Sequence, residues 1–206
     1  SGFGGMYTNV MKGRMEKSEY FLSDREAFLY QLKGEIEKAL IKHKDNAIVT
    51  IRLNGTTDIA WEKFNVFDGK NIFEIFPSVQ FYDYTKNWLR FDRELPKNYY
   101  LTFSRSETNH SKCIELLNRG INVAMVFDKI PSTFEGFEVI NADTDDLRFL
   151  DKRGTICGLK YKKMTGKGAD NSKAFSSGFA IRTESIENRL INLKKKIRKK
   201  NLVLSN

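Results

Sequence analysis

The sequence is poor in the residues that build disulfide frameworks, metal centres and membrane spans. Its 206 residues include two cysteines, three prolines and two histidines. Cys113 and Cys157 fall in an expected helix and an expected strand, which predicts two buried thiols. No apolar run approaches the roughly 20 residues that a bilayer span requires, and the sequence does not begin with a signal-peptide pattern. We therefore expect a soluble, cytoplasmic protein with no membrane partner.

Common nucleotide-binding and metal-binding signatures are also lacking. The sequence contains neither a P-loop nor a GxGxxG motif. His43 and His110 lie far apart, without a His or Cys neighbour at ligand spacing, and the DTDD of residues 143–146 lacks the glycine and terminal Glu of a calcium loop. We therefore predict no metal site. A serine nucleophile at Ser104 or Ser106 would require His110 to turn towards it as a base.

Composition and charge describe a folded domain with a basic extension. With 40% hydrophobic and 13% aromatic residues the chain can bury a core. Residues 1–151 hold 20 Lys and Arg against 23 Asp and Glu, a net charge of −3, whereas residues 152–206 hold 15 against 3, a net charge of +12. We expect an α/β domain over residues 1–181 and a basic helix or tail over 182–206. The glycine-rich start, which has no initiator Met, is typical of a fragment of a longer protein.

Residues 98–128 contain the clearest pattern in the chain. An aromatic and β-branched run, Tyr99–Phe103, is followed by the polar turn 104–109, an amphipathic helix closed by Gly120, and the apolar run 123–127. Two strands joined through a helix run parallel, and a parallel sheet binds its ligands at the carboxyl ends of its strands. The polar turn is therefore expected to lie at a binding edge.

The remaining segments extend this pattern along the chain. Ser23 and Glu26 form a possible capping box in front of a helix over 24–42, with a stripe of Phe28, Leu29, Leu32, Ile36 and Leu40. Residues 162–178 have the composition of a mobile loop. The alternation of strands and helices predicts an α/β fold with a mainly parallel sheet, curled towards a partial (β/α) barrel. Strands are expected near 47–53, 79–84, 99–103, 122–127, 137–140 and 155–161, and shorter helices near 11–21, 60–64 and 71–76.

Polar residues follow four of the expected strands. Because the carboxyl ends of parallel strands meet at one edge of the sheet, we expect most of these side chains to line a single cleft, with Glu107 close to Asn54 or Asp58. The candidate catalytic residues are Asp58, Glu107 and Asp143, and the candidate cofactor-binding residues are Asn54, Gly55, Thr56, Asp83, Lys86, Ser104 and Asn109. Polar loops and helix caps would give the same pattern without any ligand.

The carboxyl-terminal segment allows two interpretations. Ile186, Leu190, Leu193 and Ile197 keep helical spacing. A helix with basic side chains around one face could bind the phosphates of nucleic acid, and it could equally be a solvated terminal helix. The basic residues are Lys194, Lys195, Lys196, Arg198, Lys199 and Lys200.

Five segments occur in a specific order along the chain: RLNGTTDIAWE (52–62), FPSVQFYDYTK (76–86), NYYLTFSRSETN (98–109), NVAMVFD (122–128) and VINADTDDLRFLDKRGTICGLK (139–160). Together they resemble a phage and plasmid protein family named after mycobacteriophage gene product eighty-eight. The resemblance covers residues 2–181, and no activity is established for the family.

The resemblance also implies a candidate chemistry. Family members carry cysteines upstream of the segment matching residues 1–9, a layout similar to that of radical S-adenosylmethionine enzymes, which hold an iron–sulfur cluster on a three-cysteine loop. By that analogy, residues 54–56 would meet the methionine part of S-adenosylmethionine, whereas Ser104, Glu107 and Asn109 would meet its ribose. This chain contains no such cysteine loop, and it could not hold a cluster by thiolate ligation.

Two functional hypotheses remain. The first is an enzyme, or part of one, with a small-molecule site at the strand ends and S-adenosylmethionine with an iron–sulfur cluster as possible cofactors of a longer form. The second is a nucleic-acid-binding accessory protein of a mobile element. Neither the reaction nor the oligomeric state follows from the sequence.

The basic segment provides the first testable prediction. If it binds nucleic acid, replacing its six basic residues with Gln should weaken binding and flatten the dependence of the logarithm of affinity on the logarithm of salt concentration. Fluorescence anisotropy with a labelled oligonucleotide, titrated at several salt concentrations, measures both. Unchanged affinity and salt slope would assign the segment to the solvated-helix interpretation.

Overall fold

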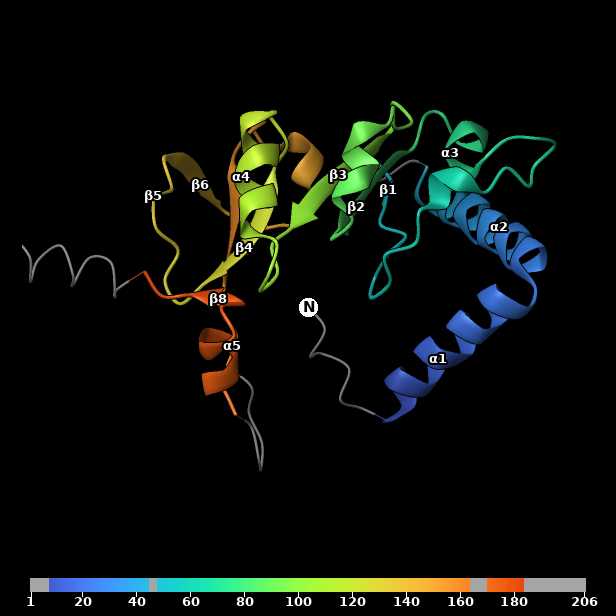
Figure 1. Cartoon of the computed structure of the whole chain (residues 1–206). Coiled ribbons are helices and arrows are strands. Elements are labelled where there is room, and N and C mark those ends of the chain that lie inside the picture. Colours follow the sequence, from blue (N-terminus) through green and yellow to red (C-terminus); the bar gives the residue numbers. More distant parts are fainter. Residues whose placement is uncertain (1–7, 45–47, 164–169, 184–206) are drawn as a thin grey trace, which may run out of the picture. The chain divides into compact units, whose positions relative to one another are not determined.

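The described residues form a mixed α/β structure, with eight strands in a mostly parallel sheet (Figure 1). The computed structural model describes residues 8–44, 48–163 and 170–183. The strand order is β1-β2-β3-β4-β7-β6-β5, and β8 pairs with β4. The chain divides into two compact units, Ser1–Leu101 and Thr102–Asn206, referred to below as unit 1 and unit 2. The described strands are β1 (Thr50–Ile51), β2 (Gln80–Thr85), β3 (Tyr99–Ser104), β4 (Val123–Phe127), β5 (Thr133–Phe134), β6 (Phe137–Asn141), β7 (Ile156–Lys160) and β8 (Ala180–Ile181).

The described helices are mostly short. Two consecutive helices, α1 (Thr8–Ser23) and α2 (Arg25–His43), meet at an angle at the start of unit 1 (Figure 1). None of the described helices is long and apolar enough to cross a membrane. The others are η1 (Trp61–Lys63), α3 (Ile72–Ile75), η2 (Trp88–Asp92), α4 (His110–Asn118), η3 (Arg148–Leu150) and α5 (Ser172–Ser176).

The predicted helix over 24–42 is confirmed as α2, but its predicted cap is wrong. The N-cap is Asp24, whose carboxylate accepts a hydrogen bond from the Ala27 backbone N–H at 3.0 Å. Ser23 ends α1, where its hydroxyl donates to the Tyr20 carbonyl at 3.2 Å. The aspartate accepts from the Ala27 N–H, whereas the predicted serine would have accepted from the Glu26 N–H, so the helix start is capped one residue further along the chain.

The core of unit 1 forms around α2 and β2. The predicted apolar stripe of α2 is confirmed, because Leu29 and Ile36 are buried and the other three members pack around them. β1 and β2 run parallel, with Thr50 opposite Gln80. Along β2 the side chains of Phe81, Asp83 and Thr85 point to the buried face. This alternation places one carboxylate inside the core.

In unit 2 the sheet is built around β4. β4 runs parallel to β7 along its whole length, from Val123 opposite Ile156 to Phe127 opposite Lys160. On its other edge it pairs with β3 and, two residues further along, with β8. The βαβ unit predicted over residues 98–128 is therefore confirmed, with α4 as its helix. After α4 the chain turns at Gly120, whose φ of +79° favours glycine.

Two features of unit 2 differ from the prediction. Residues 172–176, predicted as part of a loop, form α5 and lead into β8. The short strand β5 pairs antiparallel with β6, whereas the pairs β1–β2, β3–β4, β4–β7, β4–β8 and β6–β7 are parallel. The helix predicted for residues 184–204 lies outside the described residues. The prediction of one domain over 1–181 with a tail over 182–206 stays a prediction.

The α2 stripe provides a stability test. Ile36 is 3% exposed, whereas Ile41 on the same helix is 71% exposed. Truncating the buried side chain in Ile36→Ala should lower the free energy of unfolding by about 2–5 kcal/mol, because it leaves a cavity. Ile41→Ala should change it by about 0.5 kcal/mol or less. Urea unfolding followed by circular dichroism measures both values, and equal losses would contradict the packing of α2.

Candidate functional site

The loop after β1 is folded around the side chain of Asn54, which is 2% exposed. Its Nδ2 donates to the Ile59 carbonyl at 2.9 Å and to Asp83 Oδ2 at 3.1 Å. Its Oδ1 accepts from Thr57 Oγ1 at 2.8 Å, from the Ile59 N–H at 3.0 Å and from Trp61 Nε1 at 3.0 Å. One amide thus fixes both the loop over residues 54–61 and the indole ring at its end.

Asp83 joins this loop to the strands β2 and β3. Its carboxylate is 1% exposed and accepts from the Asn54 backbone N–H at 2.7 Å and from the Tyr99 hydroxyl at 3.0 Å, in addition to the Asn54 amide. Burial raises the pKa of Asp83 to about 6, and the opposing effects of these donors, Arg52 and Arg90 are smaller. The carboxyl group therefore titrates near neutral pH while enclosed in the core.

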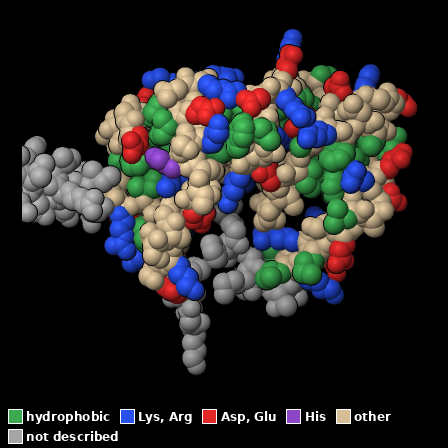
Figure 2. Space-filling view, viewed as in Figure 1, with side chains coloured by type: hydrophobic (Ala, Val, Ile, Leu, Met, Phe, Trp, Pro, Cys, Tyr) green, Lys and Arg blue, Asp and Glu red, His purple; other side chains and the backbone are tan. Residues whose placement is uncertain are grey.

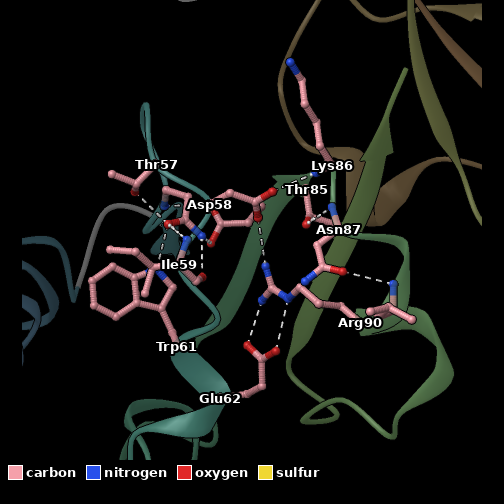
Figure 3. A network of polar contacts seen from close by, with 12 residues as sticks. Thr57, Asp58, Ile59, Trp61, Glu62, Thr85, Lys86, Asn87 and Arg90 are labelled. Atoms are coloured by element: carbon pink, nitrogen blue, oxygen red, sulfur yellow. Dashed lines mark hydrogen bonds and ion pairs between the residues drawn. The ribbon is translucent and has the colours of Figure 1, made fainter. Parts of the chain in front are cut away.

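A second buried charge, Arg90, extends the network (Figure 3). Its guanidinium donates through Nε and Nη2 to both carboxylate oxygens of Glu62, at 3.1 and 2.7 Å. Nη1 contacts Asp58 Oδ1 at 3.3 Å, and Nη2 also donates to the Tyr99 hydroxyl at 3.0 Å. Because an unpaired buried charge is costly, these contacts keep the guanidinium of Arg90 paired with Asp58 and Glu62.

Asp58 also bonds to the end of β2. Its Oδ2 accepts from the Lys86 backbone N–H at 2.8 Å, while the Lys86 side chain is exposed and points away from the network (Figure 3). Beside it, the Thr85 hydroxyl accepts from the Asn87 N–H at 3.0 Å. Lys86 thus takes part in the network through its backbone.

A cavity of about 410 Å³ lies in unit 1 where α1, α2 and the loop after β1 meet. Gly55, Thr56 and Thr57 line it, so it opens beside the carboxyl end of β1. Apolar side chains form much of its wall, and Arg14, Lys17 and Arg52 supply positive charge. The apolar lining residues are Phe21, Phe28, Leu32, Leu53, Ile59 and Trp61, and the other polar ones are Ser18, Tyr20, Gln31 and Glu35.

The predicted residues of unit 2 form separate local contacts. Asn109 accepts from the Ser106 N–H at 2.7 Å and donates to the Ser104 carbonyl at 3.1 Å, which closes the turn before α4. Asp143 accepts from the Lys160 N–H at 2.7 Å. Glu107 is exposed. The structure brings Asn54, Asp58, Asp83 and the Lys86 backbone together in unit 1, and the single cleft predicted to include residues of both units stays a prediction.

His110 contacts an arginine at the start of α4. Its Nδ1 accepts from Arg105 Nε at 3.3 Å, and its Nε2 lies 4.0 Å from Glu135 Oε1. Arg105 Nη1 also donates to the carbonyls of Gly178 and Phe179, at 2.6 and 3.1 Å. The Arg105 contacts fix the chain leading into β8. The Arg105 and Glu135 contacts involve both ring nitrogens of His110, the histidine that the serine-nucleophile hypothesis requires as a base.

The two cysteines are free and buried, as predicted. Burial raises the pKa of Cys113 to about 11 and that of Cys157 to about 12, so both thiols are protonated at neutral pH. They do not fit the three-thiolate loop of an iron–sulfur cluster. Within the described ranges, no group of three or more His, Cys, Asp or Glu residues could hold a metal ion.

Several residues of this site were not identified from the sequence. Tyr99 and Arg90 were not singled out, although aromatic and charged residues next to a predicted strand end are a usable signal. Trp61, Phe21 and Arg14 line the cavity from the expected helices near 11–21 and 60–64, to which the sequence assigned no functional role. Among the site residues predicted from the sequence, Gly55 and Thr56 are the two that line the cavity.

The chain belongs to the Gene product 88 family, whose model matches residues 2–182. The resemblance found in the sequence is thereby confirmed. Searches among curated proteins and among solved structures found no match.

The buried carboxyl group predicts a pH effect on stability. The pKa of Asp83 is raised from 3.8 to about 6 in the folded state, so the folded protein binds this proton more tightly than the unfolded chain. The contribution of Asp83 to the free energy of unfolding should therefore rise as pH falls from about 7 to 4, by on the order of 3 kcal/mol.

The test compares the wild-type chain with Asp83→Asn, since other carboxylates titrate in the same range. The difference between their unfolding free energies, measured in urea at several pH values, should shift in favour of the wild type as pH falls. A difference that stays constant between pH 7 and 4 would contradict the raised pKa.

Proposed function

We propose that this protein binds a small molecule in the cavity of unit 1, at the carboxyl end of β1. The observation that carries the proposal is the cavity itself: about 410 Å³ of space bounded by the exposed loop residues Gly55, Thr56 and Thr57 and by aromatic side chains. This volume lies in the range of small-molecule sites, which combine a mainly apolar wall with a few polar groups.

The hydrogen-bond network beneath the loop supports the same function. Asn54 and Asp83 are buried and satisfied, so they hold the backbone of residues 54–59 in one conformation. A loop fixed before the ligand arrives loses less conformational entropy on binding. The polar groups predicted from the sequence as direct ligand contacts are thus proposed to act by positioning Gly55 and Thr56.

The enzyme hypothesis is the narrower form of this proposal. By the resemblance to radical S-adenosylmethionine enzymes, Gly55 and Thr56 would contact the methionine part of that cofactor, and both line the cavity. The same proposal includes the expectation that the sheet curls towards a partial barrel with alternating helices. The cysteines of this chain do not fit a cluster, so no reaction step is assigned.

The cavity is tested with N-phenyl-1-naphthylamine, a neutral aromatic molecule that fluoresces in apolar surroundings. It should bind saturably and receive excitation energy from Trp61, whose side chain lines the cavity. Thr56→Phe, which adds a ring to the cavity wall, should reduce this binding at least severalfold. Asn65→Phe adds the same ring at an exposed residue outside the cavity and should leave binding unchanged.

The possible results separate the two forms of the proposal. Absence of saturable binding, or equal binding by Thr56→Phe and the wild type, would contradict the cavity as a ligand site. Displacement of the naphthylamine by S-adenosylmethionine would support the narrower form. Binding of the naphthylamine without such displacement would support the cavity as a ligand site and contradict S-adenosylmethionine as its ligand.

A further inference from the structure

We infer that the ligand of this cavity is an anion with a flat apolar portion. This inference rests on the proposed function and adds the chemical class of the ligand. The apolar wall and the charged residues of the same cavity carry this inference. A carboxylate, sulfonate or phosphate would supply the anionic group.

The apolar wall is suited to a flat group. Phe21 packs against Phe28 and Trp61 with ring centroids 5.4 Å apart in both pairs. Phe28 and Trp61 are stacked at 6.3 Å, with 18° between their ring planes. Phe21 and Trp61 are largely buried, so the partly exposed ring of Phe28 offers the more accessible aromatic surface of this wall to a further planar group. Trp61 is additionally fixed by its hydrogen bond to Asn54.

The charged residues of the cavity favour an anion. Arg14, Lys17 and Arg52 line it together with a single carboxylate, Glu35, so its lining carries a net formal charge of +2. Residues 1–151 as a whole carry −3, so this local excess of cations runs against the surrounding composition. A cluster of cations beside an apolar wall attracts anions and fixes their orientation.

Arg52 is held in place before any ligand binds. Its guanidinium lies over the Tyr84 ring, 4.7 Å from the centroid, and its Nε donates to the Asn54 carbonyl at 3.3 Å. An arginine fixed by stacking loses less side-chain freedom when it pairs with an anion than an unrestrained lysine does. The same backbone segment thus positions the loop of the cavity and one of its cations.

Other surfaces give weaker grounds for an inference. Hydrophobic side chains reach the surface over α1, including Met11 and Met15 (Figure 2). Nothing in the structure shows what would cover them. The cavity differs because it combines enclosure, aromatic rings and an excess of one charge.

The test compares two matched molecules, N-phenyl-1-naphthylamine and 8-anilinonaphthalene-1-sulfonate, which differ by a sulfonate group. The sulfonate should bind roughly tenfold more tightly, the size expected for two or three partly exposed ion pairs. This preference should shrink as salt concentration rises. Dissociation constants come from fluorescence titration of the full chain, with energy transfer from tryptophan as the second readout.

The variants assign the preference to the cavity. The double substitution Arg14→Gln and Lys17→Gln should remove most of the preference, expressed as the ratio of the two dissociation constants, because these cations favour the sulfonate through their charge. The double substitution Lys12→Gln and Lys38→Gln removes the same net charge from exposed positions of α1 and α2 outside the cavity. It should retain the preference, and Thr56→Phe should weaken binding of both molecules.

The outcomes distinguish the inference from the proposed function. Equal affinity for the two molecules, or a preference that survives in the Arg14 and Lys17 variant, would overturn the anionic class while leaving the cavity as a ligand site. Failure of both molecules to bind would overturn the proposed function itself. Sulfonate binding that persists in Thr56→Phe would place the anion site elsewhere and overturn the inference.

Discussion

The carboxylate of Asp83 is the interaction on which the rest of unit 1 depends. It lies inside the core on β2, where it accepts two hydrogen bonds from Asn54 and one from Tyr99. Tyr99 in turn accepts from Arg90, which pairs with Glu62 and Asp58. Each buried member of this network, Asn54, Asp83, Tyr99 and Arg90, therefore has a partner, which is the condition for tolerating polar groups in a core. The result is a fixed link between the loop after β1, the end of β2 and the start of β3.

Unit 2 also contains a buried arginine that is paired with two carboxylates. Arg148, on η3, is 1% exposed and contacts Asp145 Oδ1 at 2.9 Å and Asp151 Oδ2 at 3.0 Å. In both units a planar guanidinium connects carboxylates from short irregular segments, which lack the backbone hydrogen bonds of long helices and strands. Charged side chains thus substitute for regular secondary structure in holding the loops between strands. Within DTDD, Asp145 contacts Arg148, whereas Asp143 accepts a hydrogen bond from the Lys160 backbone N–H on β7.

The sequence predicted the regular elements well because their hydrophobic periods are strong. Six expected strands and the helix from 24 to 42 correspond to described elements, whereas β5 and β8 are two residues long and carry no period. Within the site, Asn54 and Asp83 were predicted as ligand contacts because polar residues at strand ends are expected to face solvent. Their burial depends on Tyr99 and Arg90, which are separated from them along the chain. The contacts that link Asp83, Tyr99 and Arg90 form between segments, so no hydrophobic or polar pattern within one segment predicts them.

The residues that fix the loop after β1 differ from the residues that line the cavity beside it. Asn54 and Asp83 satisfy each other and are enclosed, so their chemistry determines loop geometry without contact with a ligand. Gly55, Thr56 and the cations Arg14, Lys17 and Arg52 line the space where a ligand would lie. Substitutions at the enclosed positions are therefore expected to change the conformation of the loop and the stability together, whereas substitutions at exposed lining positions such as Lys17 and Thr56 would act mainly on affinity. Under the proposed function, Asn54 and Asp83 would thus be essential to the site without touching the ligand.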